Sequence, residues 1–335
     1  MNYTNKEKKI LSELNRLLPN IEFGLSRAGT EKAVNSSHYF ISPQFTSLFG
    51  SEYFYKETPT FIHFSTLFGI EGILTTKNIR LYNINNLTDP REYSFAGNVI
   101  TIDSKYKKDA KDNLFLLSMC NTDLLQGSTE IEFNMWRLYG DNGKGVAIEL
   151  SFDKSSLINW VDYFLSSVQY GAESRTKLKE LNNLLSRYNA AKPKVSIDLG
   201  QIACFHKSRL FGLEKEIRLL YDNRIHRVAG ARTYKDQNDN ITSPNIKIDI
   251  TKSTLTDREI KYLELPIYNN KFVPVYDENP IPIPKIERII LGYHYNDNFL
   301  KVAKYIESIC ETNLGYKPKI IKSRLTNYYH DLSSS

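Results

Sequence analysis

The sequence predicts an α+β fold whose core is a split, strongly bent β-sheet flanked by helices. Short apolar runs typical of buried strands are mixed with amphipathic helical segments, without the regular alternation that marks a doubly wound parallel sheet. No internal repeat appears in the 335 residues. Hydrophobic residues make up 41% of the chain and charged residues 24%, proportions that indicate a globular protein and exclude a disordered or collagen-like chain.

The first half of the chain begins with a predicted helix and continues into short strands. Residues 5–18 place apolar residues at helical spacing, and Pro19 ends the pattern. Residues 19–58 show little periodicity and are predicted to be rich in loops. Beyond them, apolar runs and turn signals predict strands at 61–64, 79–81, 114–120 and 145–152 and helices at 66–74 and 130–139.

The second half mixes the same two kinds of element. A charged helix is predicted at 173–190, while residues 222–260 are polar and irregular, which is typical of an insertion. The chain beyond Tyr329 is expected to be a disordered tail. Strands are predicted at 202–207, 214–221 and 286–293, and a closing helix at 297–310.

This order of elements divides the chain into three predicted parts. Residues 1–58 form an N-terminal helical and loop extension, and residues 313–335 form a C-terminal tail. Between them, residues 59–312 form the principal domain, with insertions near 153–200 and 222–285. A chain of 335 residues is long enough for one large domain with insertions of this kind.

Charge and cysteine usage restrict the possible partners and compartment. The net charge of +6 permits a nucleic-acid substrate without requiring one. Cys120, Cys204 and Cys310 are widely spaced and odd in number, so neither a disulfide framework nor a structural zinc site is expected. The sequence has no apolar signal core and no run of 18 apolar residues, so a cytoplasmic protein without a membrane partner is expected.

Several common enzyme signatures are absent from the sequence. The glycine-rich patterns GxGxxG and GxxxxGK[ST] are missing, which argues against a Rossmann dinucleotide site and a P-loop nucleotidase. HExxH and GxSxG are missing too, which removes support for a zinc peptidase and an α/β-hydrolase. The six histidines include no pair at metal-ligand spacing. We therefore expect a site without a bound metal.

Three clusters of polar residues remain as candidate sites, and the first two combine polar with aromatic side chains. His63 and Ser65 share one face at the end of a predicted strand and could hold an amide or a ribose hydroxyl. The alternative is a structural histidine bonded to a backbone carbonyl. In the second cluster, Tyr139 follows Trp136 by about one helical turn, so Tyr139 could stack on a planar ring while Trp136 packs inward. Such a stripe is also typical of a core.

The third cluster lies on the predicted strand at 214–221. Strand alternation places Glu214, Glu216 and Arg218 on one face. One carboxylate could hold a ribose hydroxyl and stabilise an oxocarbenium-like centre, while its neighbour orients or activates the nucleophile. Arg218 would hold the carboxylates in place. The alternative is a solvated, salt-bridged edge strand.

In chain order, these clusters resemble a bacterial family of unknown function, DUF2971. The resemblance covers roughly residues 60–310, and it is carried by four motifs. The motifs are His63-Phe-Ser65; Asp89-Pro90-Arg-Glu92; Met135-Trp136-Arg-Leu-Tyr139 followed by Gly143 and Gly145; and Lys207 with Glu214-Lys-Glu216-Ile-Arg218. The family usually has an asparagine directly before Asp-Pro, where this chain has Thr88.

The family pattern is in turn similar to the ADP-ribosyltransferase fold, in which a His or Arg, a Tyr or Ser-Thr-Ser, and a Glu follow one another. His63, Tyr139 and Glu216 match the His-Tyr-Glu version in order. The resemblance implies that His63 and Ser65 bind the ribose and amide of NAD and that Tyr139 stacks on the nicotinamide. It implies that Glu216 holds the ribose hydroxyl and stabilises the developing cation, while Glu214 steers the acceptor.

The resemblance therefore implies an ADP-ribosyltransferase-like catalytic domain at 59–312 with NAD as co-substrate. The implied activity is mono-ADP-ribosylation of a macromolecule by a toxin of a toxin–antitoxin or phage-defence system. The basic charge balance favours a nucleic acid, RNA above DNA, over protein as the acceptor. A neutralising antitoxin would be a further partner. The implied catalytic residues are Glu216, Glu214, Tyr139 and His63, and the cofactor-binding residues are His63, Ser65, Arg80, Asn86, Tyr139, Trp136 and Ser118.

Three other functions remain open at this point. The same chemistry without an acceptor would make the protein an NAD glycohydrolase. A binding module for a nucleotide or a partner protein would show no turnover. A metal-dependent nuclease would place Asp89, Glu92, Glu214 and Glu216 around a divalent cation. A chelator, an NAD requirement and the release of nicotinamide without acceptor distinguish these functions.

Overall fold

A computed structural model describes most of the chain. The motif residues Asp89, Pro90 and Glu92 and the predicted tail beyond Tyr329 lie outside the described residues. The described residues are 4–28, 38–43, 48–57, 59–87, 108, 111–125, 127–155, 157–160, 162–189, 195–224, 234–235, 241–242, 246–252, 257–270 and 281–327.

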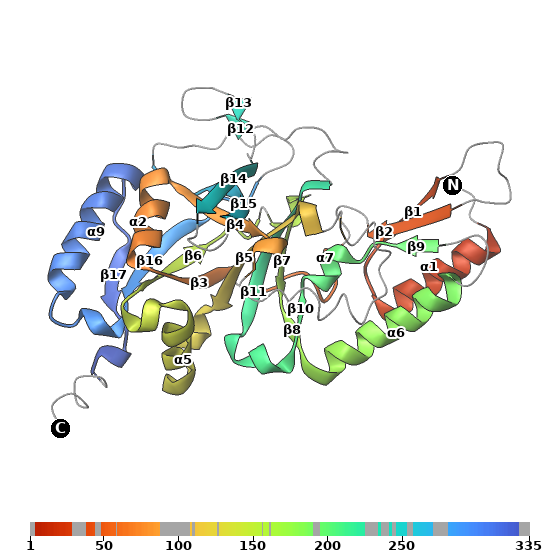
Figure 1. The fold of residues 1–335 in the computed structure, drawn as a ribbon, viewed down its shortest axis with the longest axis horizontal. Helices are drawn as coiled ribbons and strands as arrows, with labels where there is room; N and C mark the ends of the chain where they lie inside the picture. The colour runs from red at the N-terminus through yellow and green to blue at the C-terminus, as the bar shows by residue number, and fades with distance from the viewer. Residues whose placement is uncertain are drawn as a thin grey trace.

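A ten-stranded sheet forms the core, and its strands come from the whole length of the chain (Figure 1). All described strand pairs within it are antiparallel except the pair of β16 with β17. The strands are β3 (Thr60–Ser65), β4 (Asn78–Asn83), β5 (Leu114–Asn121), β6 (Val146–Ser151), β7 (Tyr163–Ser167), β11 (Glu216–Asp222), β14 (Ile246–Lys252), β15 (Asp257–Pro266), β16 (Lys285–Leu291) and β17 (Lys319–Lys322).

The sheet divides at β5. Strand β11 pairs with β5 from Leu114 to Cys120, so β3 and β4 must share the other edge of β5. β3 pairs near the end of β5, at Cys120 and Asn121, whereas β4 pairs near its start. One arm then continues through β6, β16 and β17, and the other through β15 and β14. This open, mixed, bent sheet confirms the predicted α+β class.

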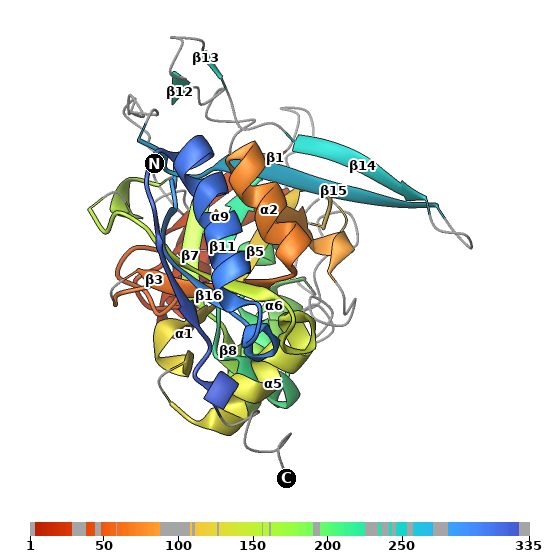
Figure 2. The ribbon, with the colours of Figure 1, turned by 90° about the vertical axis from the view of Figure 1, so that its left-hand side faces the viewer.

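Helices cover both faces of the arm that contains β3. On β3, Phe61 packs with α2 (Leu67–Thr76) and α9 (Phe299–Leu314), while Ile62 and Phe64 pack with α5 (Thr129–Tyr139). Adjacent strand residues point to opposite faces, so the alternation of β3 places these helices in separate layers. Figure 2 shows α2 and α9 side by side, in agreement with the contacts between them.

The N-terminal part of the chain packs with the middle of the chain. Helix α1 (Asn5–Leu17) lies against α6 (Gly171–Asn189), and their leucines share one core cluster. The neighbouring elements are a three-stranded sheet of β1 (Phe23–Ala28), β2 (His38–Pro43) and β9 (Val195–Ile197), the short helix α7 (Gly200–Ala203), and the paired strands β8 (Gln169–Tyr170) and β10 (His206–Lys207).

Two predictions for this part of the chain were wrong. Residues 19–58, predicted to be rich in loops, contain β1 and β2, which pair with each other. Residues 202–207, predicted to be a strand, form the second half of α7 and the two-residue β10. Ile202 and Phe205 are fully buried. A short, continuous apolar run does not distinguish a buried strand from a buried helical turn.

The segments predicted as insertions and tail contribute strands to the main sheet. β7 lies within 153–200, β14 and β15 lie within 222–285, and β17 lies within 313–335. The outer parts of β14 and β15 extend from the body as a two-stranded ribbon (Figure 2). The short strands β12 (Tyr234–Lys235) and β13 (Ile241–Thr242) also pair. In the described part of the chain, no helix combines the length and apolar character needed to cross a bilayer.

Candidate active site

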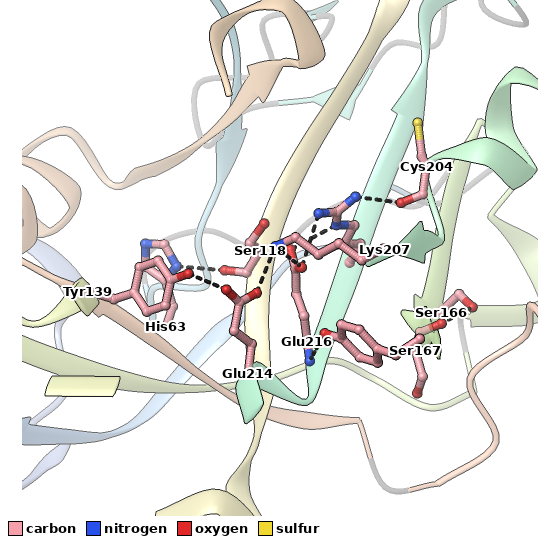
Figure 3. A network of polar contacts seen from close by, with 11 residues as sticks. His63, Ser118, Tyr139, Ser166, Ser167, Cys204, Lys207, Glu214 and Glu216 are labelled. Atoms are coloured by element: carbon pink, nitrogen blue, oxygen red, sulfur yellow. Dashed lines mark hydrogen bonds and ion pairs between the residues drawn. The ribbon is translucent and has the colours of Figure 1, made fainter. Parts of the chain in front are cut away.

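A cavity of about 480 Å³ opens where β3, β5, α5 and β11 meet the 3₁₀ helix η5 (Arg209–Glu214). Part of its apolar wall, formed by Ile62, Phe64 and Met135, comes from the cluster beneath α5. Its polar side chains come from elements far apart in the sequence (Figure 3). These polar residues are His63, Ser118, Cys120, Tyr139, Lys207, Glu214 and Glu216.

Strand register explains why β5 and β11 contribute to the same cavity. Glu216 pairs with Cys120, and Arg218 pairs with Ser118. Residues directly opposite each other in an antiparallel pair share one face of the sheet. This face of β11 is therefore charged, although β11 is buried along its whole length between β5 and β7. The alternative of a solvated edge strand was wrong for this segment.

Glu214 reaches the cavity by a different route from the predicted one. It ends η5, and Lys215 follows in the left-handed region at φ 44°. The strand begins only at Glu216, so strand alternation does not place Glu214 beside Glu216. Instead, the turn at Lys215 brings the Glu214 side chain back over the cavity, where Lys207 contacts both carboxylates.

A buried network of charges connects the two glutamates. The ammonium of Lys207 lies 2.7 Å from Oε2 of Glu214 and 2.9 Å from Oε2 of Glu216. Arg218 donates to both oxygens of Glu216, from Nε at 2.8 Å and from Nη2 at 3.0 Å. Its Nη1 also donates to the carbonyl of Cys204 at 2.6 Å. The network therefore contains two cations and two carboxylates, and the positive charges equal the negative charges in number.

The charges determine the ionisation of Glu216. Burial by itself raises the pKa of this carboxyl, but Arg218, Lys207 and the hydrogen bonds from Arg218 and Ser118 outweigh burial and lower the pKa to about 2. Glu216 is therefore a carboxylate throughout the neutral range. Its oxygens accept one bond from Lys207, two from Arg218 and one from the Ser118 hydroxyl, and these four bonds fill the four lone-pair positions of a carboxylate.

Glu214 is bonded less completely. Its Oε2 accepts from Lys207, and its Oε1 accepts from the hydroxyl of Tyr139 at 2.5 Å. These two bonds leave about half of the lone-pair positions of a carboxylate open. Tyr139 is 44% exposed, so part of its ring remains available at the mouth of the cavity. Of the two glutamates, Glu214 is thus the better placed to accept a bond from a ligand.

His63 lies at the point where β3 and β5 diverge. Its Nδ1 is 3.0 Å from the backbone carbonyl of Ser118, which β3 does not reach through its main chain. A carbonyl only accepts, so Nδ1 carries the hydrogen and Nε2 is an acceptor in the neutral ring. Burial lowers the pKa of His63 below 6.5, against the opposing effect of the hydrogen bond to Ser118. The neutral form is therefore favoured at pH 7.

Four residues predicted to bind the cofactor do not line the cavity. The Ser65 hydroxyl lies against Gly69 in the first turn of α2. The guanidinium of Arg80 lies 4.0 Å from the centre of the Tyr262 ring. The side chain of Asn86 bonds to the main chain of β15, at Glu259 and Lys261.

Trp136 is the fourth. It is fully buried, stands edge-on to Phe64, and donates its indole N–H to Glu132 at 3.2 Å. This position agrees with the prediction that Trp136 packs inward, and it leaves a core role rather than contact with a cofactor. Tyr139, three residues later, lies on the cavity side of α5.

The structure adds residues that sequence reasoning had given no role. Lys207 was part of a motif, but its separation from Glu214 and Glu216 does not reveal that it contacts both. The phenol oxygen of Tyr170 accepts the backbone N–H of Glu216 at 3.0 Å. The Phe211 ring centre lies 4.7 Å from the Lys207 ammonium, a cation–π distance. Within the described ranges, no group of three or more His, Cys, Asp or Glu residues is arranged to hold a metal.

Comparison with known proteins identifies one family. The family described as "Protein of unknown function (DUF2971)" matches residues 135–219. No curated protein and no solved structure gives a significant match. The matched segment runs from α5 to β11 and includes Tyr139, Lys207 and both glutamates of the cavity. The predicted resemblance to DUF2971 is thus confirmed for residues 135–219, the part of the chain that carries most of the charged network.

Proposed function

We propose that the protein is an NAD-dependent mono-ADP-ribosyltransferase. The observation that carries the proposal is the meeting of His63, Tyr139 and the two glutamates around one cavity, although they come from four different elements. The order of these residues along the chain is that of the His-Tyr-Glu enzymes it resembles. The cavity also combines an aromatic ring at its mouth with ionised carboxylates inside, which suits a ligand with a planar ring and a sugar.

The proposed reaction breaks the bond between nicotinamide and ribose. Positive charge develops on the ribose carbon, and a fixed carboxylate stabilises that charge more in the transition state than in bound NAD. Nicotinamide leaves with the bonding electron pair. A nucleophile of the acceptor then bonds to the ribose carbon and loses its proton. The products are the ADP-ribosylated acceptor, nicotinamide and one proton.

The two glutamates take different parts in this proposal. Glu214 has open lone-pair positions and faces the cavity, so it is assigned to the ribose and its developing charge. Glu216 is saturated by Arg218, Lys207 and Ser118 and holds the cations in place. The resemblance to the His-Tyr-Glu enzymes had implied that Glu216 holds the ribose. The difference arises because motif order along the chain gives no information on how many bonds each carboxylate already accepts.

The other two cavity residues orient the ligand. The partly exposed ring of Tyr139 stacks on the nicotinamide, and its hydroxyl holds Glu214. The acceptor nitrogen Nε2 of His63 takes a hydrogen bond from a ribose hydroxyl or from the carboxamide N–H. Both contacts fix the scissile bond relative to Glu214, which is the positional contribution expected of such residues.

The acceptor is proposed to be a nucleic acid, for which the support is the net charge of +6. Modification of RNA or DNA would make the protein toxic to a cell, which agrees with the predicted role in a toxin–antitoxin or phage-defence system. An antitoxin would then act by preventing NAD or the acceptor from reaching the cavity.

Incubation of the purified protein with labelled NAD and a cell lysate tests the proposal. Label in a macromolecule that survives protease but not nuclease is the expected result. Label that survives nuclease but not protease would indicate that the acceptor is a protein and not a nucleic acid. Nicotinamide release without a labelled macromolecule would indicate a glycohydrolase, and no release with or without lysate would contradict the proposed reaction.

A further inference from the structure

Lys207 occupies an unusual position beside the cavity. Its ammonium is within hydrogen-bond distance of Glu214 and Glu216 at the same time, and its side chain is only 3% exposed. In Figure 3 it lies between the two carboxylates. The two carboxylates are therefore close neighbours in a region with little water. Two like charges in such a place disfavour each other's ionised form unless cations compensate them.

The two cations of the network divide this task unequally. Arg218 binds Glu216 through two of its nitrogens. Lys207 is the cation that contacts Glu214. Without Lys207, Glu214 would keep its bond from the neutral hydroxyl of Tyr139 but would lie next to the negative charge of Glu216 without the compensating ammonium. A protonated Glu214 cannot stabilise positive charge on a ribose.

We propose that Lys207 is a positioning residue, whose ammonium keeps Glu214 ionised beside Glu216 and fixes its carboxylate at the cavity. The inference rests on the proposed function, which assigns the ribose to Glu214. Lys207 itself touches no reacting atom in this proposal. The Phe211 ring beside the ammonium limits the directions it can take and so directs it toward the carboxylates.

Other titratable groups face the same network and belong to the prediction. They come from every element packed around it: His63 on β3, Cys120 on β5, Tyr139 on α5 and Tyr170 on β8. Burial raises the pKa of the Cys120 thiol and of the Tyr170 phenol, with the negative charge of Glu216 acting in the same direction. Both groups are therefore neutral at pH 7. Of these neighbouring groups, His63 is the one whose ordinary pKa lies near neutral pH, so its protonation must be followed separately from that of the carboxylates.

The test compares Lys207→Met with Lys207→Arg and Lys215→Met. Arginine keeps the positive charge at the same place. Lys215 lies between the two glutamates in the sequence, but its side chain is exposed, so its substitution removes one charge outside the network. Carbon-13 NMR of the glutamate carboxyl groups, assigned with Glu214→Gln and Glu216→Gln, follows protonation of the pair directly. The pH dependence of nicotinamide release is measured in parallel.

In Lys207→Met, protonation of the pair and the acidic limb of the rate profile are expected to move up by about one to three pH units. Lys207→Arg restores most of the wild-type titration, and Lys215→Met leaves it unchanged. An unchanged carboxyl titration in Lys207→Met, or an equal shift in Lys215→Met, overturns the inference. Lys207→Gln, which keeps an N–H donor without the charge, replaces the methionine variant if the latter does not fold.

The NMR measurement separates this inference from the proposed function. If the wild-type protein releases no nicotinamide, the proposed reaction fails. The carboxyl titration still decides whether Lys207 keeps the pair ionised. If nicotinamide is released and the titration does not move, the reaction stands and the role of Lys207 is refuted.

Discussion

His206 and Lys207 are neighbours in the two-residue strand β10, but their basic groups are held in opposite states. The ring of His206 is fully buried between Tyr53, whose hydroxyl is 3.0 Å from Nε2, and Ser174, whose hydroxyl is 2.6 Å from Nδ1. Burial, with a smaller contribution from the charge of Lys177, lowers the pKa of His206 to about 3, so the ring is neutral. Lys207, equally buried, forms ion pairs with two carboxylates.

The difference lies in the partners and not in the depth of burial. A buried base surrounded by hydroxyl groups loses its charge, because nothing replaces the solvation of the charged form. A buried base beside carboxylates keeps its charge, because the carboxylates supply that stabilisation. One side of β10 is consequently neutral and joins the N-terminal elements to α6. The other side carries charge into the cavity.

The largest expected effect is on the charged side, at Glu216. Glu216→Gln leaves the guanidinium of Arg218, which is 1% exposed, without its carboxylate. Breaking a buried ion pair by removing one partner costs about 3–5 kcal/mol. We expect the free energy of unfolding in urea at pH 7 to fall by that amount, with loss of activity. A variant as stable as the wild type would show that the network contributes little to the fold.

Glu214→Gln should separate chemistry from stability. Lys207 and Arg218 both keep Glu216 as a partner in this variant, so the unfolding midpoint should change less than in Glu216→Gln. Removing a group that stabilises transition-state charge lowers the rate by about 100- to 1000-fold. The measurement is nicotinamide release from NAD at saturating concentration. Nicotinamide release near the wild-type rate would indicate that Glu216, and not Glu214, binds the ribose.

The neutral side should show itself in the pH dependence of stability. The pKa of His206 is about 3 in the folded protein and about 6.5 when solvated, so the unfolded state binds more protons between these values. The contribution of the neutral His206 ring to the free energy of unfolding is fully present above pH 6.5. It should fall by about 1.4 kcal/mol per pH unit as the pH decreases from 6.5 toward 3.

Urea unfolding between pH 7 and pH 5 measures this slope. His206→Gln should reduce it, and substitution of the exposed His294 by Gln should not. His63, whose pKa is also lowered, adds to the slope in the same direction. Glu216, with a pKa of about 2 against 4.5, acts in the same direction but only below pH 4.5. A slope that His206→Gln leaves intact would contradict the neutral state inferred for this ring.

The smallest effect is expected at a residue outside both regions. Arg80 lies over the Tyr262 ring and not in the cavity. Arg80→Ala should lower the free energy of unfolding by about 0.5–2 kcal/mol, the range for a cation–π contact between a half-buried cation and a buried ring. Nicotinamide release should stay at the wild-type rate. A large loss of release would place Arg80 in the site after all.

The sequence predicted most of the elements that surround the cavity. The apolar runs at β3, β5, β6 and β16 and the periodicities of α2, α5 and α9 were each recognised within a few residues. Strong local patterns of this kind dominate where a segment is buried and regular. His63, Tyr139 and Glu216 were also named in advance, because motif order along the chain indicated them, and the structure places all three at the cavity.

What the sequence did not reveal depends on contacts between distant segments. No local pattern shows that β11 is a central strand, because its charged face is compensated by Lys207 and Arg218 inside the fold. The left-handed turn at Lys215 separates Glu214 from the strand. The sequence does not signal this turn, because neither glycine nor asparagine, the residues that favour this conformation, stands there. The strands of the predicted insertions form only by pairing with parts of the sheet that lie far away in the sequence.

The division of the sheet at β5 has a mechanical consequence. Among the described residues, neither β3 nor β4 pairs with residues 117–119 of β5, yet β11 pairs with this stretch without interruption. Along this stretch, the strand at the floor of the cavity is therefore paired with β11 on one edge and with neither β3 nor β4 on the other. Such a floor resists local unfolding, so widening of the cavity must come from the surrounding arms and not from the strand that carries Ser118.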